Sequence, residues 1–159
     1  MQTTFSIITA TYNSEKTLER TIKSVLNQSY SNFEYIIIDG GSTDGTFKVV
    51  EKYGSFLKYY ISEKDSGIYD AMNKGIKKSK GNWLYFLGSG DEFLVQNVNR
   101  LQFKNLNAKM IYGNVFLMQK LQIYDGEFSM LRLMKKNICH QAIFYHKSIF
   151  QDFGNFDAR

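Results

Sequence analysis

Three consecutive isoleucines, followed by an aspartate and two glycines, constrain the fold of this chain more than any other feature. Residues 36–38 are apolar without alternation, which predicts a strand buried on both faces, as in a parallel sheet covered by helices. Asp39 follows at the carboxyl end of this strand, and Gly40 and Gly41 allow another backbone to approach closely. Because ligands of open α/β sheets bind outside the carboxyl ends of the strands, we expect Asp39 to face a ligand.

Strand and helix patterns alternate through the first part of the chain. Strands are predicted at residues 5–10, 33–38, 57–61 and 83–87, with helices at 14–27 (capped by Ser14), 46–53 and 68–80 (buried through Ile68, Met72 and Ile76). This alternation is typical of a parallel sheet with right-handed crossovers. After residue 105 we expect an antiparallel pair at 110–118 and 121–124, helices at 129–135 and 147–153, and a strand at 142–145.

The composition indicates one globular domain. Of the 159 residues, 43% are apolar and 16% aromatic, which excludes a disordered chain. A single cysteine, no transmembrane run and no signal-peptide pattern at the N-terminus predict a cytoplasmic protein. The net charge of +5 favours anionic partners, namely phosphorylated small molecules, anionic lipid headgroups or nucleic acid. The lysines are spread along the chain, so charge alone does not choose among these.

Three predicted strand ends converge on one edge of the sheet: residues 11–13, Asp39 and Asp91. Two carboxylates and the ring of Tyr12 suit a nucleotide, because the ring can stack on a base and Asp39 can accept hydrogen bonds from uracil or ribose. Asp91 can hold Mg²⁺ or Mn²⁺, which commonly need only one or two carboxylates besides substrate phosphates. A nucleotide site at this edge is therefore predicted.

These residues also have plainer interpretations. Asp91 could cap a following helix, and Ser42, Thr43 and Asp44 are expected to form a cap and turn rather than ligand contacts. Asp39 is different, because a carboxylate at a strand end before two glycines has no evident structural role.

Six segments of the chain, in order, resemble the inverting family-2 glycosyltransferases, which use nucleotide sugars and have the A-type glycosyltransferase fold. These segments are residues 6–13, 24–30, 38–46, 67–75, 86–91, and His140-Gln141 followed by 154–157. The resemblance covers nearly the whole chain. It implies an α/β fold with a Rossmann-like, mostly parallel sheet, helices on both faces and a small antiparallel C-terminal part.

The resemblance also implies roles for individual residues. The substrate-binding set would be Thr11, Tyr12, Asn13, Asp39, Asp70, Ser89, Gly90, Asp91 and His140, with Asp91 as the metal ligand. Residues 1–104 would form the nucleotide-binding half of a single domain, and residues 105–159 the start of the acceptor-side half. The reaction would transfer a sugar, by default from a UDP-sugar, to a glycan or lipid-linked saccharide. The protein would then be cytoplasmic, with peripheral association at the inner face of the membrane.

Two departures from the family pattern stand out. Gly88 and Gly90 occupy positions where the family often has aspartate, so metal binding would depend on Asp91. The family's catalytic base is an aspartate shortly after the segment that matches residues 154–157, and neither Asp152 nor Asp157 matches its position. We therefore expect a chain truncated before the base, with impaired transfer and no catalytic residue of its own.

Three other functions compete with a sugar-transferring enzyme. A dinucleotide-dependent oxidoreductase would need Gly-x-Gly-x-x-Gly after the first strand, where this chain has residues 9–13 without glycine. A nucleic-acid-binding module is disfavoured because no such signature is present. A non-catalytic, nucleotide-sugar-binding domain of glycosyltransferase type remains the alternative. The sequence leaves open the sugar, acceptor, cation and oligomeric state.

Overall fold

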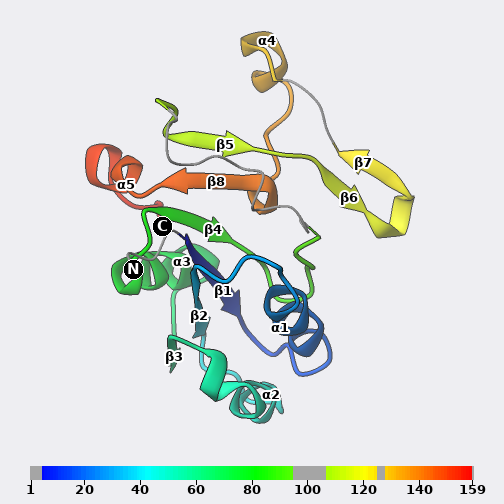
Figure 1. Ribbon diagram of the computed structural model, residues 1–159, viewed down its shortest axis with the longest axis vertical. Coiled ribbons are helices and arrows are strands. Elements are labelled where there is room, and N and C mark those ends of the chain that lie inside the picture. Colours follow the sequence, from blue (N-terminus) through cyan, green and yellow to red (C-terminus); the bar gives the residue numbers. More distant parts are fainter. Residues whose placement is uncertain (1–4, 95–106, 125–127, 159) are drawn as a thin grey trace.

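A six-stranded sheet forms the centre of the computed structural model, which describes residues 5–94, 107–124 and 128–158 (Figure 1). The sheet order is β3-β2-β1-β4-β8-β5. β1 is parallel to β2 and β4, β2 is parallel to β3, and β8 is antiparallel to β4 and β5. The strands are β1 (Phe5–Thr11), β2 (Phe33–Asp39), β3 (Tyr59–Ser62), β4 (Trp83–Phe86), β5 (Met110–Tyr112) and β8 (Ile143–His146). The predicted mixed, mostly parallel sheet is confirmed.

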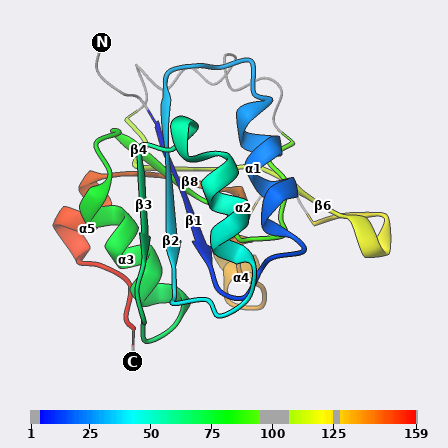
Figure 2. The same cartoon turned by 90° about the horizontal axis from the view of Figure 1, so that it is seen from below.

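Helices cover both faces of this sheet, as Figure 2 shows with the strands running lengthwise between them. α1 (Leu18–Leu26) and α2 (Thr46–Lys52) lie on one face, and α3 (Ile68–Lys78) and α5 (Ser148–Phe153) on the other. The remaining elements are β6 (Val115–Leu117), β7 (Gln122–Tyr124), α4 (Met130–Leu133) and the 3-10 helices η1 (Gly54–Phe56), η4 (Met118–Lys120) and η5 (His140–Ala142). None of the helices in the described part of the chain has the length and apolarity needed to cross a membrane.

The isoleucine run divides its side chains between the two layers. Ile37 belongs to the core beneath α1 and α2, whereas Ile36 and Ile38 belong to the core beneath α3. All three are fully buried, so the strand is buried on both faces as predicted. This burial holds Asp39, the last residue of β2, at the carboxyl edge of the sheet.

Two details of the predicted helices are wrong. α1 begins at Leu18 rather than after Ser14, because the chain first makes a turn in which the Ser14 carbonyl accepts from the amides of Thr17 and Leu18. Ile68 is exposed, because α3 buries Ala71, Gly75 and Ile76 instead. For α3 the contact with the sheet, rather than the local pattern, sets the buried face.

The predicted strand at 110–118 is two strands. β5 pairs with β8 and extends the main sheet, whereas β6 pairs antiparallel with β7 in a separate two-stranded sheet. Residues 121–124 were predicted to pair with the whole of 110–118, and in the structure β7 pairs with β6 and not with β5. The predicted boundary between halves, at 104 and 105, lies outside the described residues.

Gly75 lets α3 approach β1 closely, which gives a first testable prediction. A Cβ at this position would lie 2.4 Å from Cγ2 of Ile8. Gly75→Ala should therefore lower the free energy of unfolding by about 1–3 kcal/mol through overpacking, although alanine is intrinsically the better helix former. Urea denaturation measures this. Gly54→Ala, where a Cβ meets nothing within 4 Å, is the matched control and should be neutral or slightly stabilising. Equal stability of the two variants would contradict the prediction.

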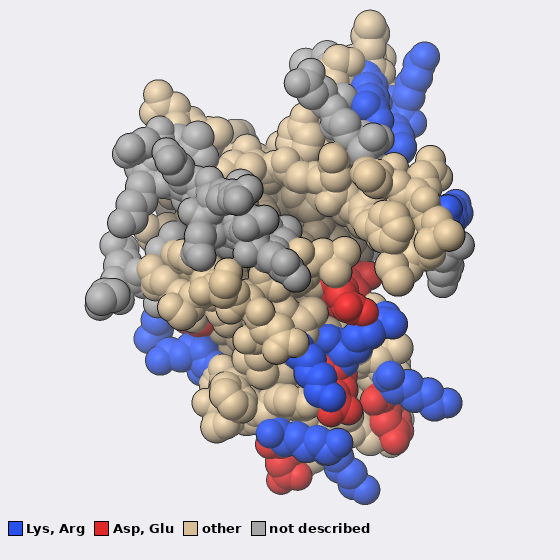
Figure 3. Space-filling view, turned by 45° about the vertical axis from the view of Figure 1, so that its right-hand side comes forward, with Lys and Arg blue, Asp and Glu red and all other residues tan. Residues whose placement is uncertain are grey.

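Charged side chains are unevenly distributed over the surface. In the view of Figure 3 the described acidic side chains lie in the lower half, whereas Lys and Arg side chains lie at the top, over α4.

Candidate functional site

The strand order creates a topological switch point beside β1. β2 and β3 lie on one side of β1 and β4 on the other, so the direction of winding reverses between β1 and β4. In open α/β sheets ligands bind at such a switch point, outside the carboxyl ends of the strands. The loops that follow β1, β2 and β4 meet here.

Hydrogen bonds join these three loops. The Asn13 amide donates to Ser42 Oγ at 2.7 Å, and the Thr43 amide donates to Asn13 Oδ1 at 2.9 Å. Ser14 Oγ lies 2.8 Å from Ser89 Oγ. Asn13 has a φ of 45°, a left-handed conformation that asparagine tolerates better than most residues. The predicted convergence of three strand ends is therefore present, and Asn13 holds the loops together.

Asp39 is buried and accepts hydrogen bonds from its own loop and from β3. Its Oδ1 accepts from Ser42 Oγ at 2.5 Å, and its Oδ2 accepts from the Ser42 amide at 3.0 Å and from Ser62 Oγ at 2.5 Å. Only 1% of the residue is exposed. The expectation that Asp39 lacks a structural role is wrong, because this carboxylate fixes the turn after β2 and attaches it to β3. A ligand would meet a carboxylate whose orientation is already set.

Asp91 differs from Asp39, because its carboxylate accepts no hydrogen bond from any described residue. The backbone around it is firmly held: Thr21 Oγ1 accepts from the Gly90 amide at 2.8 Å and donates to the Asp91 carbonyl at 2.8 Å. Arg20 also donates to the Gly90 carbonyl. A loop held by Thr21 thus presents a carboxylate that accepts no hydrogen bond from the described residues.

The backbone geometry and close contacts of this loop explain why Gly88 and Gly90 are glycines. Gly90 has a φ of 105°, which strains any residue with a Cβ. A Cβ on Gly88 would lie 2.8 Å from Asp91 Oδ2, so the carboxylate folds back over Gly88. An aspartate at Gly90 would strain the backbone, whereas an aspartate at Gly88 would require the Asp91 side chain to move aside.

The metal prediction fits these residues only in a limited form. No cluster of three or more His, Cys, Asp or Glu side chains that could hold a metal occurs among the residues that the structure describes. Asp91 offers carboxylate oxygens that accept no hydrogen bond from the described residues. Such a set suits a cation that also takes ligands from a diphosphate and water, since Mg²⁺ is often bound by one or two carboxylates plus substrate phosphates.

Asp44 performs the cap role that the sequence indicates. Its Oδ1 accepts from the Thr46 amide at 3.0 Å, at the start of α2. The hydroxyl of Thr46 donates to the same oxygen and lowers the pKa of Asp44. The corresponding interpretation of Asp91 as a helix cap is wrong, because residues 92–94, which would begin such a helix, are not helical.

Asp70 holds the loop between β3 and α3. Its Oδ2 accepts from the Ser66 amide at 3.1 Å and pairs with Lys74 Nζ at 3.6 Å. Partial burial alone would lower the pKa of Lys74, but the hydrogen bond to Glu63 and the charges of Asp70 and Glu63 raise it overall. The same loop places Asp65 against Gly40, where a Cβ would lie 2.6 Å from Asp65 Oδ2. Asp70 therefore shapes the edge of the site through this loop.

The other predicted residues occupy different depths at the same edge. Tyr12 is 61% exposed, whereas Thr11 is buried and its Oγ1 has no hydrogen-bond partner among the described residues. His140 is exposed in η5. Because β8 is antiparallel to β4, its beginning lies at the carboxyl end of β4, and Tyr85 Oη donates to the Gln141 carbonyl there. His140 thus reaches this edge from the C-terminal part of the chain.

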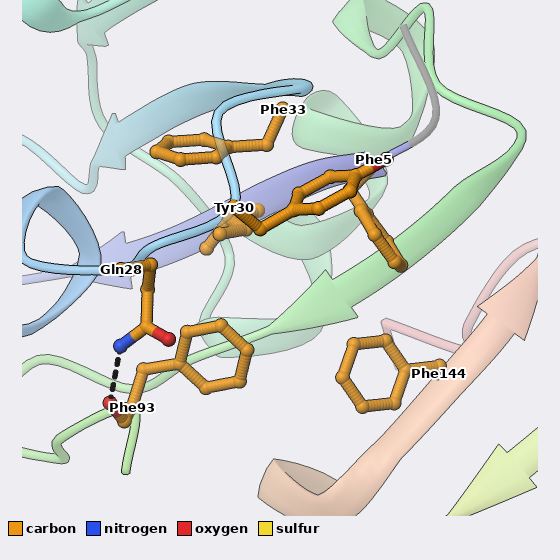
Figure 4. Close-up of a pocket in the computed structure, with 7 residues that line it drawn as sticks. Phe5, Gln28, Tyr30, Phe33, Phe93 and Phe144 are labelled. Atoms are coloured by element: carbon orange, nitrogen blue, oxygen red, sulfur yellow. Dashed lines mark hydrogen bonds between the residues drawn. The ribbon is translucent and has the colours of Figure 1, made fainter. Parts of the chain in front are cut away.

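A small apolar cavity lies elsewhere. It has a volume of about 10 Å³ and is lined by Phe5, Ile7, Gln28, Tyr30, Phe33, Phe93 and Phe144 (Figure 4). Gln28 closes one side by donating to the Phe93 carbonyl at 2.8 Å. Space for about one water molecule cannot hold a nucleotide. Phe5 and Phe33 begin their strands, so the cavity is also at the other end of the sheet from Asp39.

Sequence reasoning missed the roles of three serines of this site, Ser14, Ser42 and Ser62. Ser42 was interpreted as part of a turn, and Ser14 as a helix cap, yet both join loops from different strands. Ser62 was not considered, although the parallel register places it opposite Asp39. The available signal for Ser62 was that a polar residue follows the strand predicted at residues 57–61, at its carboxyl end.

Comparison with known proteins gives one family and several related chains. Residues 6–117 match the family described as Glycosyl transferase family 2. A PGL/p-HBAD biosynthesis glycosyltransferase of Mycobacterium bovis (strain BCG / Pasteur 1173P2) is 34% identical over 163 residues, which cover 98% of this chain and 64% of that protein. The UDP-Glc:alpha-D-GlcNAc-diphosphoundecaprenol beta-1,3-glucosyltransferase WfgD of Escherichia coli is 36% identical over 113 residues, 69% of this chain and 44% of that protein. The chain spans less than two thirds of the length of these curated relatives.

Among solved structures, the mannosyltransferase PcManGT from Pyrobaculum calidifontis, in complex with GDP-Man and Mn2+, is similar with a TM-score of 0.76. The two sequences are 14% identical, and the match covers 97% of this chain and 47% of that one. At this identity the likeness shows a shared fold.

Proposed function

We propose that this chain, which belongs to glycosyl transferase family 2, binds a nucleotide-diphosphate sugar at the carboxyl ends of β1, β2 and β4. The whole protein would transfer the sugar to a glycan or lipid-linked saccharide with inversion at the anomeric carbon. The observation that carries the proposal is the joined set of loops at the switch point, with an oriented Asp39 on one side and, on the other, Asp91, whose carboxylate accepts no hydrogen bond from the described residues.

UDP is the nucleotide that the site residues suit best. The carboxylate of Asp39 has about four lone-pair positions, and its three hydrogen bonds within the protein leave one of them unused. It can therefore accept a further hydrogen bond from the ring N–H of uracil. The exposed ring of Tyr12 can stack on the base. The printed name of WfgD, a relative 36% identical, includes a UDP-sugar donor and supports the same choice.

The acceptor is proposed to be lipid-linked. WfgD is named for an acceptor saccharide on diphosphoundecaprenol. His140 at the edge of the site would face the sugar or the acceptor, and residues 105–159 would begin the acceptor-side half. An acceptor of this kind would place the protein at the inner face of the cytoplasmic membrane.

Each residue has a definite task in the displacement. The acceptor hydroxyl attacks the anomeric carbon, the bond from that carbon to the diphosphate breaks, and a carboxylate base takes the hydroxyl proton. Asp39 would hold the nucleoside, Asp91 would hold the cation, and the 88–91 loop would keep Asp91 in place through Thr21. A divalent cation, when bound, neutralises charge on the departing diphosphate. The base is expected from the part of the relatives' length that this chain does not span.

Calorimetric titration with UDP, with and without MnCl2, tests the proposal. The chain should bind UDP, and manganese should tighten binding by on the order of tenfold or more. Asp91→Ala should remove the manganese effect without loss of stability, because no described residue hydrogen-bonds its carboxylate. Asp152→Ala removes one carboxylate from α5 and serves as the control. Equal manganese coupling in Asp91→Ala and wild type would contradict the assignment of Asp91.

A transfer assay separates the enzyme from the alternative, a non-catalytic nucleotide-sugar-binding domain. We expect residues 1–159 to bind UDP and to transfer sugar poorly. Full turnover would show that the base lies within this chain.

A further inference from the structure

Large apolar side chains are exposed in the segment between the β5 edge of the sheet and η5. We call the described residues 115–124 and 128–136 the arm; in Figure 1 it extends outward from β5 as β6, β7 and α4. Met118, Leu121, Leu131 and Met134 are each 71–79% exposed. Phe116 and Ile123, a cross-strand pair of the β6–β7 hairpin, are 40% and 53% exposed. Large exposed apolar side chains that gather in one segment of the chain are expected at an interaction surface.

Basic residues are interleaved with these apolar ones. Residues 115–136 contain four basic and two acidic residues, and Met134 is followed directly by Lys135 and Lys136. Figure 3 shows Lys and Arg side chains gathered over α4. The described residues of the arm thus carry exposed apolar side chains and basic side chains together.

The arm is anchored to the sheet. Tyr112 of β5 accepts at its Oη from the Phe128 amide at 3.0 Å, and the two rings lie 5.7 Å apart, edge to face. The guanidinium of Arg132 lies 4.8 Å from the centre of the Phe128 ring. Because α4 is anchored through Phe128 and Arg132, the exposure of Leu131 and Met134 belongs to a defined conformation.

We propose that the arm binds the surface of an anionic lipid membrane. Apolar side chains would enter the boundary between headgroups and acyl chains, while Lys120, Lys135 and Lys136 would lie against anionic headgroups, the combination that drives interfacial binding. A protein partner is less well matched, because lysine is depleted from protein interfaces. The last described residues do not cover the arm, since Phe156 pairs with Asn73 of α3 through two hydrogen bonds.

The arm also leads directly into η5, so its attachment would hold the edge of the site that carries His140 near the lipid. This inference goes beyond the proposed function and does not depend on nucleotide binding.

Sedimentation with lipid vesicles tests the proposal on the 159-residue chain without nucleotide. The chain should bind vesicles of phosphatidylcholine and phosphatidylglycerol, bind phosphatidylcholine alone much more weakly, and lose affinity as salt increases. Leu131→Ser/Met134→Ser and Lys135→Glu/Lys136→Glu should each weaken binding by about tenfold or more.

Two matched variants control for general charge and hydrophobicity. Lys77→Glu/Lys78→Glu makes the same charge change at the end of α3, and Phe56→Ser removes a ring that is 61% exposed in η1. Both should bind like wild type, and circular dichroism should show that all variants are folded. Equal binding by arm and control variants would overturn the proposal. Self-association in sedimentation velocity that Leu131→Ser/Met134→Ser abolishes, without vesicle binding by the wild type, would overturn it in favour of a second copy. UDP titration of the same variants reports separately on the proposed function.

Discussion

Asp39→Ala should abolish measurable UDP binding and lower the free energy of unfolding by about 2–4 kcal/mol. The buried carboxylate accepts three hydrogen bonds, so its removal leaves the amide and hydroxyl of Ser42 and the hydroxyl of Ser62 without their acceptor. The turn after β2 would loosen as well as lose its nucleoside contact. Urea denaturation and calorimetry with UDP measure the two effects.

Ser62→Ala separates the structural role of Asp39 from the binding role. This change removes one of the three hydrogen bonds but keeps the carboxylate, so stability should fall by about 1 kcal/mol and UDP should still bind. If Asp39→Ala remained folded and bound UDP as tightly as Ser62→Ala, the carboxylate would be structural alone.

Glu34→Ala should destabilise the protein by about 2–4 kcal/mol while leaving UDP binding by the folded protein unchanged. Glu34 is 6% exposed, and its Oε1 accepts from Ser6 Oγ at 2.5 Å, from the Gly81 amide at 3.1 Å and from the Lys80 amide. These bonds attach the start of β4 to β1 and β2. Glu34 pairs with Ser6 at the amino ends of the strands, away from the candidate site.

The glutamine variant provides the control for Glu34. Glu34→Gln keeps an acceptor oxygen in a side chain of nearly the same shape, so the free energy of unfolding should fall by only about 1 kcal/mol. Urea denaturation that finds the alanine and glutamine variants equally stable would show that the hydrogen bonds of Oε1 contribute little.

Local patterns determined most of the architecture. The unbroken run at residues 36–38 required a strand covered on both faces, and the alternation of strands and helices required a parallel sheet. Asp44 could be identified as a cap because it lies two residues from the amide it bonds. Such features depend on residues close in sequence, so the sequence alone is sufficient to read them.

The tertiary structure decided the details of the candidate site. Ser14 bonds Ser89, 75 residues away, and Ser62 bonds Asp39, 23 residues away. The antiparallel direction of β8 brings His140 to the carboxyl end of β4. These contacts depend on strand order, direction and register, which no short pattern encodes. For the same reason the sequence placed Asp39 at the correct edge but could not show that its carboxylate is already hydrogen-bonded, whereas that of Asp91 accepts no hydrogen bond from the residues that the structure describes.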